Sequence, residues 1–150
     1  MLATLVGCTV QAGSSSQNPD RMVREFYEQY ARYDRARQHQ RAASYALENL
    51  TPDLARLVRE AERRNRAGEM ILDFDYVDTQ DSEGFKSLVV RTISAAPDRA
   101  LVGVSFEVAG EKRGLKVELR RVGDRLRIAN FDYSGRSTLV SVLHKSLKKR

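Results

Sequence analysis

The ten residues Arg99-Ala100-Leu101-Val102-Gly103-Val104-Ser105-Phe106-Glu107-Val108 decide the fold, because apolar side chains recur at every second position. Successive side chains of a β-strand point to opposite faces, so a period of two predicts a strand with one buried face. The buried face would carry Ala100, Val102, Val104, Phe106 and Val108. The solvent-facing side would carry Arg99, Leu101, Gly103, Ser105 and Glu107.

The segments on either side of this strand repeat its pattern. Alternation runs from Phe85 to Ile93, again over residues 115–120, and once more over residues 125–128. Four antiparallel strands in meander order would result. One face of this sheet would be exposed to solvent, and the apolar face would have to pack against helices. The chain would turn at Pro97-Asp98, in a hairpin loop over residues 110–114, and at Gly123-Asp124.

Helix signals stand at both ends of the chain. The run Asn18-Pro19-Asp20 supplies a cap, a first-turn proline and a first-turn acid, and an aromatic-rich apolar face follows over residues 22–33. Thr51-Pro52-Asp53 repeats the start signal, and Gly68 marks the end of that second helix. Ser137 would cap a last helix that ends in basic residues.

Residues 34–46 are ambiguous, because their Arg, Gln and Ala favour a helix while apolar side chains are few, and Leu47 and Leu50 indicate a short turn that packs inward. The predicted fold class is therefore α+β. N-terminal helices would pack on a four-stranded antiparallel meander sheet in a cone-like arrangement, and a C-terminal helix would close it.

Length and composition fit one globular domain. The chain has 150 residues and a formal net charge of +6. Acidic residues interleave with the arginines, as is typical of solvated helix faces, so no nucleic-acid partner is expected. Its single cysteine allows neither an internal disulfide nor a cysteine metal cluster. The sequence contains no run of about 20 apolar residues, so no membrane-spanning helix is predicted.

The densest functional-looking stretch is an acidic bend over residues 70–84. Its carboxylates are Asp73, Asp75, Asp78 and Asp81, and together with Tyr30 they form the candidate ligand or partner surface. Calcium prefers several oxygen ligands, but the spacing lacks the sixth-position glycine and twelfth-position glutamate of an EF-hand loop. Alternation with aromatic residues also fits an extended segment with one wet face. We expect no bound metal and no cofactor.

The N-terminal run Leu5-Val6-Gly7-Cys8 resembles the lipobox of bacterial lipoproteins, which are cleaved before a cysteine that then carries acyl chains. Residues 1–7 would be a truncated lipoprotein signal segment, because no Lys or Arg precedes Cys8. Residues 8–19 would be a flexible tether rich in Gly and Ser, and residues 20–150 a single α+β domain.

This resemblance implies a location. Lipoproteins retained in the inner membrane usually carry Asp after the cysteine, whereas this chain has Thr9. It therefore looks like an outer-membrane lipoprotein that faces the periplasm. A lipid on Cys8 would anchor it to the membrane.

The order of parts resembles the nuclear-transport-factor-2-like (cystatin-like) cone. More specifically, residues 20–147 are similar to YbjP-type bacterial envelope lipoproteins, whose domain has no assigned function. The matching segments are Val23-Arg24-Glu25-Phe26-Tyr27, Leu50-Thr51-Pro52-Asp53-Leu54, Asp73-Phe74-Asp75-Tyr76, and Leu126-Arg127-Ile128-Ala129-Asn130 with Tyr133. Leu126 stands where the family usually has tryptophan. The resemblance implies a fold and an envelope address, and no reaction.

Three functions follow as hypotheses. The first is a non-enzymatic accessory domain that binds an envelope protein partner, since the sequence has no Ser-His-Asp pattern, histidine cluster or phosphate-binding glycine loop. The second is a small-ligand pocket between the long helix and the sheet, lined by Asp73, Asp75 and Tyr30. The third is an immunity-type inhibitor of a periplasmic effector.

Overall fold

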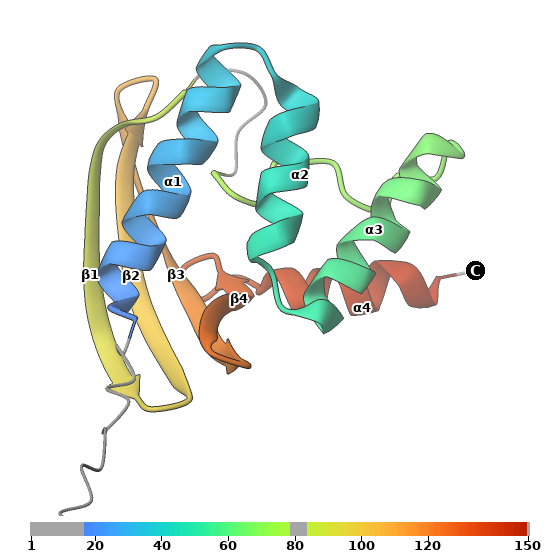
Figure 1. Ribbon diagram of the computed structural model, residues 1–150. Coiled ribbons are helices and arrows are strands. Elements are labelled where there is room, and N and C mark those ends of the chain that lie inside the picture. Colours follow the sequence, from blue (N-terminus) through green and yellow to red (C-terminus); the bar gives the residue numbers. More distant parts are fainter. Residues whose placement is uncertain (1–16, 79–83, 150) are drawn as a thin grey trace, which may run out of the picture.

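The computed structural model describes residues 17–78 and 84–149 (Figure 1). Four helices and an open four-stranded antiparallel sheet lie in this part of the chain, so the predicted α+β class is confirmed. In chain order the elements are α1 (Pro19–Arg35), α2 (His39–Asn49), α3 (Pro52–Arg66), β1 (Lys86–Ala96), β2 (Arg99–Val108), β3 (Glu111–Val122), β4 (Arg125–Asp132) and α4 (Leu139–Lys148).

The sheet is a meander with the order β1-β2-β3-β4, and every neighbouring pair is antiparallel. All five residues predicted for the inner face of β2 are buried. They oppose apolar partners on β3, with Val102 across from Val117 and Val104 across from Leu115. The hydrophobic pattern has therefore fixed the register, because a slip of one residue would turn this whole set to solvent.

The β2–β3 connection is shorter than predicted. Only Ala109 and Gly110 lie between the strands, and both have positive φ, 49° and 79°. Two consecutive positive φ values match the twist of a tight hairpin. Residues 111–114, predicted as part of a longer loop, instead pair with β2.

Helix α1 covers the inner face of the sheet over β1 and β2 (Figure 1). The Asn18 side chain accepts a hydrogen bond from the Arg21 N–H at 3.2 Å, and Pro19 occupies the first turn, as the sequence predicts. The helix buries Met22, Val23, Phe26, Tyr27, Tyr30 and Ala31.

Helix α2 lies mostly in the segment that the sequence leaves ambiguous. It buries only Ala42 and Ala46 along its axis, so its inward face carries too little apolar surface to stand out in the sequence. The ring of Tyr45 compensates by stacking on Phe26, with ring centroids 5.8 Å apart. His39 is exposed at the start of this helix and lies 3.5 Å from Asp34.

The remaining helices lie beside β4. Thr51 caps α3, and its N–H donates to the Ile128 carbonyl of β4 at 2.8 Å. Helix α4 is capped by Thr138 rather than by Ser137, because Thr138 and Ser141 form a reciprocal capping box. Arg64 ties the two helices together by donating to the carbonyls of Leu147 and Lys149.

Candidate functional site

The candidate site gathers around residues 74–78 at the edge of the helix layer. Helix α1 brings Tyr27 and Tyr30 to this segment, and the chain beyond β4 brings Tyr133. The Tyr30 hydroxyl donates to Asp75 Oδ2 at 2.5 Å. Two residues predicted from separate stretches of sequence are thus in direct contact.

The second carboxylate oxygen of Asp75 is also engaged. Asp75 Oδ1 accepts from the backbone N–H of Val77 at 2.8 Å and of Asp78 at 3.4 Å, which forms a local side-chain turn. Burial raises the pKa of the Asp75 carboxyl, against the hydrogen bonds from Tyr30, Val77 and Asp78 that lower it. Every polar contact of this carboxylate therefore serves to hold the segment in shape.

Two more tyrosines fasten the same segment through its backbone. The Tyr27 hydroxyl donates to the Val77 carbonyl at 2.9 Å, and the Tyr133 hydroxyl donates to the Tyr76 carbonyl at 2.7 Å. Burial raises the pKa of both phenols well above that of free tyrosine, so each remains a donor at neutral pH. Sequence patterning gave no sign of these contacts, since Tyr133 reads as a residue leaving the sheet.

The predicted acidic surface does not stay together. Asp75 and Asp78 lie inside the fold, and Asp78 is buried, whereas Asp73 is exposed and lies outside the tyrosine contacts. Asp81 and Cys8 fall outside the described residues. In residues 17–78 and 84–149, no group of three His, Cys, Asp or Glu side chains could hold a metal ion.

Tyr76 is the exception among the tyrosines of this region. Its ring packs edge-on against Phe131 with centroids 5.9 Å apart, and its hydroxyl is buried without a hydrogen-bond partner among the described residues. Such a group is energetically costly unless it is matched. Nothing in the sequence distinguishes it from the tyrosines that are paired.

The outer face of the sheet carries a different candidate surface. Val89 and Ile93 of β1 are 52% and 53% exposed there, and they border a hollow of about 490 Å³ over Gly103 and Gly114. A Cβ on Gly103 would lie 3.4 Å from the Ile93 Cδ1, so the missing side chain makes room for Ile93. We call this the outer-face hollow.

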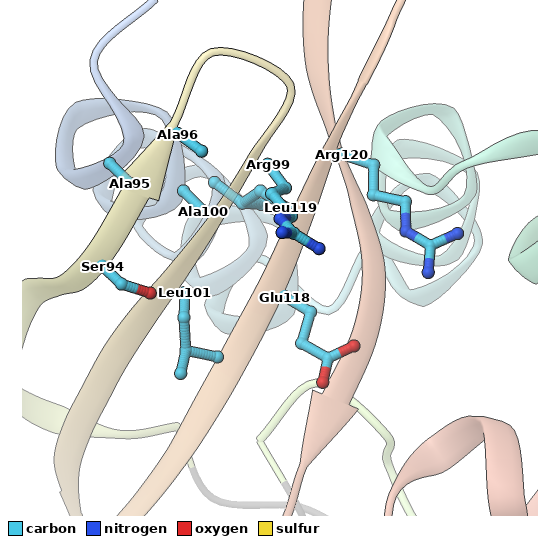
Figure 2. A pocket seen from close by; sticks show the side chains of 9 residues that line it. All are labelled: Ser94, Ala95, Ala96, Arg99, Ala100, Leu101, Glu118, Leu119 and Arg120. Atoms are coloured by element: carbon cyan, nitrogen blue, oxygen red, sulfur yellow. The ribbon is translucent and has the colours of Figure 1, made fainter.

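A second hollow, of about 480 Å³, lies farther along β1, β2 and β3 (Figure 2). Arg99 and Arg120 project from β2 and β3 beside it, together with Leu101 and Glu118.

No helix in the described part of the chain is both long enough and apolar enough to cross a membrane. Comparison of the chain with protein-family models, with curated proteins and with solved structures finds no match.

Proposed function

We propose that this chain is a lipid-anchored, non-enzymatic domain of the bacterial envelope that binds a protein partner through the outer-face hollow. The anchor rests on the lipobox-like run that ends at Cys8. The observation that carries the binding role is the pair of half-exposed apolar side chains, Val89 and Ile93, which border a hollow on a sheet face that no helix of residues 17–78 and 84–149 covers.

The side chains around the outer-face hollow indicate what kind of partner surface would fit it. Arg91 and Lys116 lie on either side of Gly103 in the strand register, so cations flank the apolar centre. A partner that inserts an apolar side chain over Gly103 and brings carboxylates to its rim would complement both features. An immunity-type inhibitor would be one form of the same protein-binding role.

The hydrogen bonds around Asp75 favour a protein-binding role over catalysis or small-ligand binding. The Tyr30 hydroxyl donates to Asp75, and Asp75 also accepts hydrogen bonds from two backbone N–H groups. These groups stabilise the fold with the same atoms that a small ligand or a reaction would need, which makes the pocket hypothesis the weaker alternative.

The anchor is tested by metabolic labelling with an alkyne-bearing fatty acid, with the gene expressed from its own locus so that any upstream residues are included. We expect label on the wild-type chain and none on Cys8→Ser. Label on neither chain, or equal label on both, would exclude the anchor.

The docking surface is tested with a photo-crosslinking amino acid placed at Val89 and, as a matched control, at Met70, which is an equally apolar side chain with 82% exposure elsewhere on the surface. We expect one crosslinked species of defined mass from position 89 alone, lost when Arg91→Glu and Lys116→Glu are combined. The same species from position 70, or none from position 89, would contradict the proposal.

A further inference from the structure

Three neighbouring strands carry arginines directly opposite one another at one end of the outer face. Arg99 of β2 is across from Arg120 of β3, and Arg120 is across from Arg127 of β4. Their chain neighbours Ala100, Leu119 and Ile128 point into the core, so alternation turns Arg99 and Arg120 outward, whereas the Arg127 side chain reaches past the edge of β4 to the Glu48 carbonyl of α2. We call Arg99, Arg120 and Arg127 the arginine row.

The arginine row is electrostatically unfavourable in the protein alone. Like charges directly opposite each other across strands repel. Among the described residues, neither Arg99 nor Arg120 takes part in an ion pair or a side-chain hydrogen bond, although Glu118 lies on the same face. Arg127 donates to the Glu48 carbonyl, which is uncharged. An anion seated across the row would relieve this repulsion.

The arginine row lies at the end of the domain where Gln17, the first described residue, contacts β4. The Gln17 side-chain oxygen accepts from the Leu126 N–H at 2.7 Å, one residue before Arg127. In Figure 1 the first turn of α1 points toward the same end as the turn between β1 and β2. Nine residue steps separate Cys8 from Gln17, which limits their separation to about 32 Å.

From these observations we infer that the arginine row binds the phosphate groups of anionic phospholipids, so that the domain stands on its membrane with this end down. The inference rests on the proposed lipid anchor for its geometry. Guanidinium groups match phosphate oxygens in bidentate hydrogen bonds, and basic side chains near an anionic leaflet are attracted to it. The hollow beside Arg99 and Arg120 gives a headgroup room to approach both.

The test uses the full chain carrying Cys8→Ser, so that acylation plays no part in the result. Binding is measured by co-sedimentation with phosphatidylcholine vesicles that contain or lack phosphatidylglycerol. We expect binding only where phosphatidylglycerol is present. Replacing the whole arginine row by glutamine should lower that affinity by at least about tenfold.

A matched control removes three charges from the opposite end of the sheet, with Lys86→Gln, Lys112→Gln and Arg136→Gln combined. It should retain nearly all of the vesicle binding. Equal losses in the two triple variants, or binding that does not depend on phosphatidylglycerol, would overturn the inference. A chain that binds acidic protein but not these vesicles would overturn it too.

A stability measurement that involves no vesicles accompanies the binding test. Because Arg99 and Arg120 repel each other and make no side-chain hydrogen bond among the described residues, replacing these two by glutamine should not lower the melting temperature in low salt below that of Lys86→Gln combined with Lys112→Gln. A lower melting temperature would show that the row is structural and would overturn the inference. Since Cys8 is replaced throughout, failure here leaves the acylation experiment standing, and the reverse also holds.

Discussion

Four tyrosines around residues 74–78 have the same chemistry and two different environments. Tyr27, Tyr30 and Tyr133 donate to this segment, while the Tyr76 hydroxyl is buried without a partner among the described residues. A made hydrogen bond contributes about 1 kcal/mol to stability, whereas an unmatched buried polar group costs about 1–3 kcal/mol. Removing a hydroxyl should therefore have opposite effects at the two kinds of position.

Tyr133→Phe should lower the free energy of unfolding by about 1 kcal/mol, because the Tyr76 carbonyl loses its donor. Tyr76→Phe should leave it unchanged or raise it by about 1 kcal/mol, because the variant keeps the ring contact with Phe131. Urea unfolding followed by circular dichroism compares the two. Equal destabilisation in both variants would mean that the Tyr76 hydroxyl has a partner.

Asp75 makes a pH prediction with a definite sign. Its pKa in the fold is raised above the value of about 3.9 for a free aspartate, so the native state holds the proton more tightly than the unfolded chain. The contribution of Asp75 to stability is therefore largest at low pH and falls as the pH rises from about 4 through the raised pKa. The difference in unfolding free energy between wild type and Asp75→Asn should fall over that interval. A difference that rises with pH would refute the assignment.

For single residues, the sequence could predict which side chains belong to the candidate site, but not which atoms they contact. Tyr30 and Asp75 were singled out because an aromatic helix face and an acidic bend are both visible as patterns, and the two residues meet. Asp73 belongs to the same pattern yet is exposed, since a residue in an irregular segment has no period that tells inside from outside. Long-range donors such as Tyr133 are set by tertiary packing alone.

The start of α3 is fixed by two hydrogen bonds of its capping residue. Thr51 accepts from the Leu54 N–H through its hydroxyl, while its own N–H is bonded to β4. The cap therefore fixes the start of a helix at the edge of the sheet.

Thr51→Ala should destabilise the protein by about 1 kcal/mol, since one N–H of the first turn loses its acceptor. Thr51→Ser is the matched control, because it removes the methyl group and retains the hydroxyl. Thermal unfolding should show a drop of about 2–4 °C for the alanine variant and a smaller one for serine. Equal drops would assign the effect to packing rather than to capping.

Elements with a strong apolar period were predictable, and α2 shows why others were not. Helix α1 and the strands β2, β3 and β4 each bury a row of apolar side chains, which leaves a visible repeat. Helix α2 instead approaches the core through Ala42 and Ala46, whose small side chains allow close packing but carry little apolar surface. The start of α4 was predicted to within one residue, since Thr138 and not Ser137 is its cap.

The whole molecule has one continuous core. Buried side chains from every helix and strand belong to a single cluster, in which Phe26 of α1 meets Phe131 of β4 with ring centroids 6.5 Å apart. No layer of the fold has a separate core on which it could persist alone.

The described domain should therefore unfold in one step. The chain has no tryptophan, so tyrosine fluorescence reports on the packing of its six tyrosine rings, while far-ultraviolet circular dichroism reports on the backbone. Both signals should give the same midpoint in urea. Two separated midpoints would show that the helices and the sheet unfold independently.

The two edges of the sheet are not equivalent. Along β4, Leu50 bridges Ile128 and Thr138 bridges Asp132, so chain already lies against that edge. In the described ranges no strand pairs with the outer edge of β1. Among the described residues, β1 is therefore the sheet edge that is more open to strand addition between copies. Two copies joined through β1 would present a β4 edge at each end of the enlarged sheet, where the two bridges hinder the addition of a further strand.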